Sequence, residues 1–224
     1  MGAGKVIYFL GPEGAGKSTN INMLIRFLRM NNVKKVKIAY VRTRHFLVRL
    51  LFKPLVPEYF SHAHDVGTWA GASHRELRLY PLIFLLEVFN AVLKTLFSVT
   101  IFYAMGYTVI CEDFLIDTIC DLERDHVRFR LKRRYFMLAI NILLRLIPRN
   151  TMIIFLNADY EELKRRYALR DGKVEPYNYI SIRVARSLYY FKLFKKTCYI
   201  DTTKQRPLET FNEVINCLRK EKML

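Results

Sequence analysis

Short apolar runs recur along the chain, and each ends at a polar residue or at glycine. Short runs rich in Val, Ile, Tyr and Phe are typical of strands that are buried on both faces of a parallel sheet. Five such strands are predicted, over residues 5–10, 36–41, 108–112, 152–156 and 198–201.

Between these runs the apolar residues recur every three or four positions, which is the spacing of an amphipathic helix. Ile21, Leu24, Ile25 and Leu28 show it within the segment 17–30. Further helices are expected over 117–147, 161–170, 180–195 and 207–219, and from about 74 through 94 and beyond, with Pro81 as a candidate kink. Strands that alternate with helices predict a single α/β domain over 1–224. It is expected to hold a five-stranded parallel sheet covered by helices on both faces.

A glycine-rich loop follows the first predicted strand. The sequence GPEGAGKS over 11–18 matches the phosphate-loop pattern G-x-x-x-x-G-K-[ST] in full, with a strand before it and a helix after it. Lys17 is expected to reach the β- and γ-phosphates of ATP, and the Ser18 hydroxyl to bind Mg²⁺. The predicted nucleotide-binding residues in this loop are Gly11, Glu13, Gly14, Ala15, Gly16, Lys17, Ser18 and Thr19.

The loop predicts nucleotide binding but leaves the reaction class open. A switch GTPase usually carries an N-K-x-D segment after a strand, and the segment 157–159 lacks the lysine. A motor or helicase needs a longer chain than 224 residues. A small kinase is the best remaining fit.

Positive charge is in large excess, with a formal net charge of +17. Such an excess favours an anionic partner, although Lys and Arg also serve simply to solvate a surface. The run 124–134 is the most basic part of the chain. It is either an exposed helix face or, in a regulator with little catalysis, a contact to RNA or to an anionic membrane. No specific nucleic-acid binding is expected, because no RNP-type aromatic motif is present.

The apolar stretch 81–105 raises the question of a membrane span. Glu87 and Lys94 interrupt it below the roughly 20 apolar residues that a span needs, so no transmembrane segment is expected. The four cysteines form no C-x-x-C pair, so a zinc site or a disulfide framework is not expected. Reduced thiols, no signal peptide and a cytoplasmic location are predicted.

Several segments resemble the thymidylate kinases and their relatives. The loop GPEGAGKST resembles their phosphate loop, and Thr43-Arg44 stands where that family has a Thr-Arg. Glu112-Asp113-Phe114 stands where it has Asp-Arg-Tyr, and 166–175 resembles its arginine-bearing lid. The resemblance implies the P-loop NTPase fold with a helical lid over about 165–180, and transfer of a phosphoryl group from Mg²⁺-ATP to a nucleoside monophosphate such as dTMP. Related kinases pair through helices, which makes 81–105 a candidate homodimer contact.

The lid is expected to supply the catalytic cation. In the resembling family an arginine comes either from the phosphate loop or from the lid, and here the loop carries Glu13. Arg166 and Arg170 are four residues apart on one predicted helix face, so we expect them to stabilise the transferring phosphoryl group. The alternative is a solvated basic helix. The resemblance also places Thr202 beside the adenine.

The acceptor side departs from the family pattern. Glu112 is expected to be catalytic and to contact the metal, and only one of Glu112 and Asp113 to face it, because neighbouring strand residues alternate. Asp113 and Val88 stand where the family has arginines that grip the acceptor phosphate. The candidate substrate-binding residues are Arg44, Tyr80, Phe84 and Asp113. The two aromatic side chains are otherwise core residues. Asp113 also raises the alternative of a non-phosphorylated acceptor, such as a nucleoside or another small hydroxyl compound.

Overall fold

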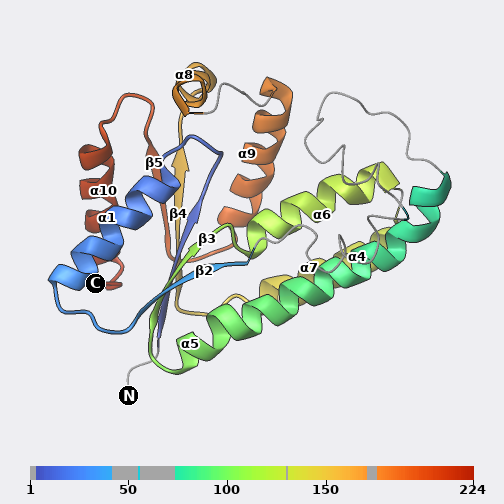
Figure 1. Ribbon diagram of the computed structural model, residues 1–224, viewed down its shortest axis with the longest axis horizontal. Helices are drawn as coiled ribbons and strands as arrows, with labels where there is room; N and C mark the ends of the chain where they lie inside the picture. Colours follow the sequence, from blue (N-terminus) through green and yellow to red (C-terminus); the bar gives the residue numbers. More distant parts are fainter. Residues whose placement is uncertain (1–3, 42–54, 56–73, 130, 171–175) are drawn as a thin grey trace.

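A single parallel sheet forms the centre of the protein (Figure 1). The computed structural model describes residues 4–41, 55, 74–129, 131–170 and 176–224. The strands lie in the order β2-β3-β1-β4-β5, and every neighbouring pair is parallel. Their bounds are β1 (Lys5–Leu10), β2 (Val36–Tyr40), β3 (Thr108–Glu112), β4 (Thr151–Asn157) and β5 (Thr197–Asp201). The predicted five-stranded parallel sheet is therefore confirmed.

Helices cover both faces of the sheet, and alternate residues of β1 divide between them. Ile7 and Phe9 pack on the face covered by α1 (Lys17–Met30) and α10 (Pro207–Lys220). Val6, Tyr8 and Leu10 point to the other face, where α4 (His74–Thr95), α6 (Leu115–Phe129), α7 (Arg133–Arg145) and α9 (Tyr177–Phe191) lie. A fully buried β1 explains why its sequence is apolar throughout.

The long helix expected from residue 74 onwards is present. It continues from α4 through a π-helical segment, η1 (Leu96–Thr100), into α5 (Ile101–Ala104). Pro81 lies inside α4. The lid helix α8 (Tyr160–Arg170) lies beyond the end of β4 (Figure 1).

The single helix predicted over 117–147 is wrong. The chain instead forms α6 and α7, and Lys132 between them is extended, with φ −60° and ψ 125°. Phe129 at the end of α6 stacks on Tyr80 of α4, with ring centroids 4.2 Å apart, and Phe136 of α7 joins the same core. Burying both aromatic rings requires the chain to turn between them, and this burial outweighs the helical pattern of the sequence.

The expectation that all cysteines are reduced is also wrong. Cys198 of β5 and Cys217 of α10 form a disulfide, with their Cα atoms 6.2 Å apart. Because α10 packs beside β5, residues that are far apart in sequence come within disulfide range. Cys111 and Cys120 are free and buried, in agreement with the expectation.

Candidate functional site

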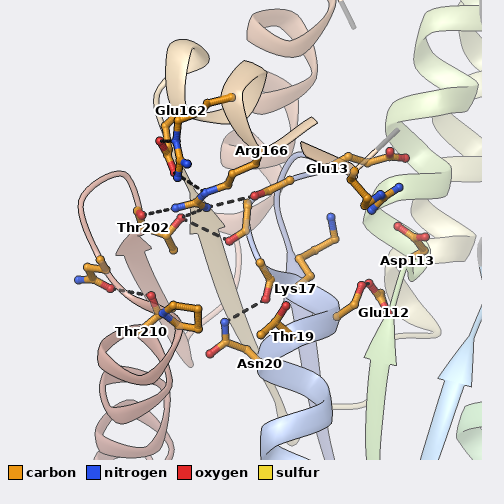
Figure 2. A pocket seen from close by; sticks show the side chains of 18 residues that line it. Glu13, Lys17, Thr19, Asn20, Glu112, Asp113, Glu162, Arg166, Thr202 and Thr210 are labelled. Carbon is orange, nitrogen blue, oxygen red and sulfur yellow. Dashed lines mark hydrogen bonds and ion pairs between the residues drawn. The ribbon is translucent and has the colours of Figure 1, made fainter. Parts of the chain in front are cut away.

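A cavity of about 650 Å³ opens where the strands of the sheet end (Figure 2). The phosphate loop, the end of β3, α8 and the segment that follows β5 all line it. In Figure 2, Glu112 and Asp113 lie on one side of Lys17, whereas Arg166 and Thr202 lie on the other. The predicted site residues that it brings together are Glu13, Gly14, Ala15, Gly16, Lys17, Ser18, Thr19, Glu112, Asp113, Arg166, Arg170 and Thr202.

Two glycines give the phosphate loop its shape. Gly11 has φ +138°, and a Cβ at this position would meet the Leu156 carbonyl oxygen at 1.9 Å. Gly16 has φ +92° and caps the N-terminus of α1. Any other residue would be strained at either position, because L side chains rarely adopt such backbone angles. The loop therefore curls tightly enough to direct main-chain N–H groups of the α1 N-terminus towards an anion.

Lys17 lies at the centre of the cavity and is almost fully buried. Its Nζ donates to the carbonyl oxygens of Gly11 at 2.9 Å and of Pro12 at 3.0 Å. Burial lowers the pKa of the ammonium, whereas the charges of Asp117 and Asp113 act in the opposite direction. A phosphate oxygen in the cavity would compete with the two carbonyls for the same ammonium protons.

Ser18 and Glu112 come together from different elements. The Ser18 hydroxyl, on the first turn of α1, donates to Glu112 Oε1 at the end of β3 at 2.5 Å. A hydroxyl and a carboxylate are the oxygen ligands that Mg²⁺ prefers, so the pair fits the predicted metal site. Within the described part of the chain, no three His, Cys, Asp or Glu side chains are grouped to hold a metal. A Mg²⁺ ion here would therefore also need phosphate oxygens and water.

The expectation that only one of Glu112 and Asp113 faces the cavity is wrong, because both line it. The alternation of side chains holds only within a strand, and β3 ends at Glu112. Asp113 has φ +52°, in the left-handed region, where the backbone no longer follows the pleat. Two carboxylates therefore lie side by side at this edge of the cavity.

Arg166 is tied to three segments of the chain. Its guanidinium donates to Glu162 Oε1 at 2.7 Å, to the Gly14 carbonyl oxygen at 3.1 Å, and to both oxygens of Thr202 at 3.0 and 2.6 Å. These bonds hold the lid helix against the phosphate loop and the end of β5. A guanidinium engaged in this way positions the loop, whereas Arg170, one turn further along α8, is left as the better candidate for contact with the phosphoryl group.

Glu13 also connects the phosphate loop to the lid. The Tyr167 hydroxyl of α8 donates to Glu13 Oε2 at 3.2 Å. Thr202, which is almost fully buried, uses its hydroxyl to contact the main-chain oxygens of Asn157 at 3.0 Å and Ala15 at 3.3 Å. The residue where relatives can carry a catalytic arginine thus serves here as an anchor for α8.

A buried cluster below the cavity was not expected from the sequence. The Tyr8 hydroxyl donates to Asp117 Oδ2 at 2.5 Å, and Arg183 of α9 lies 3.3 Å from Asp117 Oδ1. Burial, followed by the charge of Asp117, raises the pKa of Tyr8 well above its usual value. The cluster fixes α9, which returns from the lid, against β1 and α6. An acid in the first turn of α6 that follows an otherwise apolar strand end was the available signal.

Most of the predicted acceptor residues lie elsewhere. Tyr80, Phe84 and Val88 are buried in the core formed by α4, α6 and α7, and none of them lines the cavity. The expectation that the two aromatic rings stack on a substrate therefore has no support from their positions. Arg44 lies outside the described residues. Arg186 points to α6, where its Nε is 3.7 Å from Glu123 Oε2.

No protein-family model and no curated protein matches this sequence. Solved structures do match. A thymidylate kinase from Candida albicans is 16% identical, with a TM-score of 0.60 over 98% of this chain and 93% of that one. A thymidylate kinase from Ehrlichia chaffeensis is 15% identical, with a TM-score of 0.53 over 97% and 100% of the two chains. The YorR protein of Bacillus subtilis, solved with phosphorylated GDP, is 13% identical, with a TM-score of 0.53 over 98% and 99%.

These similarities extend over nearly the whole chain. At such low identity they establish the fold, which is the P-loop kinase fold of the thymidylate kinases. The resemblance found in the sequence is confirmed at that level.

Proposed function

We propose that this protein is an ATP-dependent phosphotransferase. The observation that carries the proposal is the convergence of Lys17, the Ser18–Glu112 pair and Arg170 on one cavity at the ends of the strands. Phosphoryl transfer needs little besides position and positive charge around the equatorial oxygens of the moving group. The cavity supplies a curled glycine loop, a buried ammonium and a lid guanidinium for that purpose.

Each donor-side residue has a distinct part in the proposed reaction. The main-chain N–H groups of 14–19 bind the β- and γ-phosphates, and Lys17 donates to their oxygens. Ser18 and Glu112 would hold Mg²⁺, which neutralises charge on the phosphates. An acceptor oxygen attacks the γ-phosphorus while the bond to the β–γ bridging oxygen breaks and ADP leaves. Arg170 then stabilises the charge that spreads over the transferring group.

The acceptor that we propose first is a nucleoside monophosphate such as dTMP. Its support is the shared fold with two thymidylate kinases over nearly the whole chain. In this reaction an oxygen of the acceptor phosphate is the nucleophile, and no base is required because that oxygen is already ionised.

The second candidate is a non-phosphorylated acceptor, and the position of Asp113 favours it. Asp113 and Glu112 both line the cavity, and their charges repel an incoming phosphate. A hydroxyl acceptor suits them better, because one carboxylate accepts the hydroxyl proton as the oxygen attacks the γ-phosphorus.

A panel assay tests the function and separates the two acceptors. ADP release by the full chain with Mg²⁺-ATP is measured against nucleoside monophosphates and the matching nucleosides, with Lys17→Met as the inactive control. Turnover of dTMP supports the first acceptor, and turnover of a nucleoside alone supports the second. Tight ATP binding without turnover of any acceptor would overturn the kinase proposal and leave a nucleotide-binding regulator.

A further inference from the structure

The long helix from α4 to α5 is inverted in polarity relative to an ordinary surface helix. Its polar residues Glu87, Asn90 and Thr95 are buried against the protein. Its outward residues are large and apolar, and Phe89 and Phe97 are 52% and 64% exposed. We define the α4 apolar face by the exposed residues Leu82, Leu85, Phe89, Phe97, Ile101 and Met105.

The charges around this face all have one sign. From Arg78 to Gly106 the only acid is Glu87, which is buried. Arg78 is exposed where the face begins. At its other end Lys35 donates to the Met105 carbonyl oxygen at 3.1 Å, and Lys37 lies 4.6 Å from the ring centroid of Phe102.

The neighbouring helix α7 repeats the pattern. It packs against α4, and it exposes Tyr135, Leu138 and Ile142 beside the exposed bases Arg133 and Arg134. The sequence contains no Asp or Glu from Val127 to Ala158. Apolar side chains flanked by Lys and Arg are the composition of helices that lie in the headgroup region of a membrane.

We propose that the α4 apolar face docks the protein on the surface of a membrane that contains anionic lipid. The apolar side chains enter the boundary between headgroups and acyl chains, while the flanking Lys and Arg contact lipid phosphates and carboxylates. This surface is separate from the nucleotide cavity and does not depend on the proposed reaction. It also differs from the basic run 124–134, to which the sequence assigned a possible membrane contact.

Two other occupants fit the observations less well. The helix Arg78–Ala104 is long and apolar enough to cross a membrane, with a mean hydropathy of 1.9, but 39% of its most apolar stretch is buried in the protein. A helix packed into the core along one side suits an orientation parallel to the membrane. A second copy of the chain would bring together two chains of net charge +17 with their basic flanks adjacent, which electrostatic repulsion opposes.

Vesicle co-sedimentation of the full chain tests the proposal. Phosphatidylcholine vesicles with phosphatidylserine should bind the protein, and vesicles of phosphatidylcholine alone should bind it far less. Added salt should weaken the binding. The variant Phe89→Ser/Phe97→Ser keeps the net charge and should bind at least about tenfold more weakly. The matched control, Met30→Ser/Leu193→Ser, removes exposed apolar side chains from other elements and should bind as the wild type does.

Sedimentation velocity of the same proteins identifies the competing occupant. If the wild type ignores anionic vesicles and is a dimer that Phe89→Ser/Phe97→Ser dissociates, the face is an interface between two copies and the proposal is overturned. Equal vesicle binding by the double variant and the wild type would overturn it too. Circular dichroism and the melting temperature show that each variant is folded.

Discussion

The donor side of the cavity presents main-chain N–H groups and cations, whereas the side formed by the end of β3 presents two adjacent carboxylates. The donor side is also the more interconnected of the two. Arg166 and Tyr167 of α8 hold the phosphate loop through Gly14 and Glu13. On the other side, Glu112 bonds to Ser18, and Asp113 occupies a left-handed turn.

This difference follows from how each side is encoded. A phosphate is recognised by backbone geometry, and one contiguous glycine-rich segment suffices to create that geometry. An acceptor is recognised by side chains from several elements, which only the tertiary structure brings together. The donor chemistry is therefore conventional for the fold, whereas the acceptor chemistry is particular to this chain.

Removing the central cation should have the largest effect. Lys17→Met is expected to lower kcat/KM by about 10³-fold, because the β- and γ-phosphates lose their buried charged donor. The control Lys164→Met removes an exposed lysine of α8 that lies 3.9 Å from Glu161, and it should leave the rate unchanged. ADP release measures both. Equal rates for the two variants would contradict the assignment of the donor side.

The lid arginines should separate into two roles. Arg170→Ala is expected to lower kcat about 10²-fold with little change in KM, because it removes charge stabilisation of the transition state. Arg166→Ala should instead raise the KM for ATP and lower the melting temperature, since Arg166 holds Gly14 and Thr202.

Arg165→Ala is the matched control for the lid, because Arg165 is exposed and paired with Glu162 at 2.7 Å. Steady-state kinetics in ATP decide the outcome. A larger loss of kcat in Arg166→Ala than in Arg170→Ala would reverse the two roles.

The charge of Asp113 should decide the acceptor. Asp113→Asn keeps a residue that tolerates positive φ and removes one negative charge. If the acceptor is a monophosphate, its KM should fall about tenfold, because a repulsion of a few kcal/mol near 4 Å is relieved only in part. If the acceptor is a hydroxyl compound, kcat should fall instead. Kinetics with both acceptor types check this, and unchanged constants for both would show that Asp113 does not face the acceptor.

The smallest effect is expected from the ion pair that supports the lid. The hydrogen bond from Arg165, with a further one from Arg166, lowers the pKa of Glu162 from 4.5 to about 2. The carboxylate therefore stabilises the fold fully above pH 4.5, and this stabilisation is lost as the pH falls towards 2.

Glu162→Gln should accordingly lower the melting temperature by no more than about 4 °C at neutral pH, and the difference should vanish near pH 2. Thermal denaturation across this pH range measures it, with Glu161→Gln as the exposed control. A difference that is independent of pH would show that charge is not the cause.

The sequence predicted the features that are encoded locally. The strands are continuous apolar runs because the sheet is covered on both faces, and the phosphate loop is one uninterrupted motif. The features that it failed to predict all depend on contacts between distant residues. The turn between α6 and α7 follows from the packing of Phe129 on Tyr80, and the buried Asp117 is paired with Arg183 of a different helix.

The arrangement of the cavity was only partly predictable. That Arg170 and Glu112 would meet followed from strand order, since both follow the ends of neighbouring parallel strands. The bonds of Arg166 to Thr202 were not foreseeable, because they require the relative placement of α8 and β5.

The disulfide between Cys198 and Cys217 gives stability and catalysis different sensitivities to the redox state of the medium. The bond closes a covalent ring of about 20 residues around the segment 202–206, which borders the cavity. Such a ring removes conformational freedom mainly from the unfolded chain, by about 3 kcal/mol for a loop of this size. No sulfur atom lines the cavity. A reductant should therefore lower the melting temperature by several degrees while leaving turnover unchanged well below that temperature.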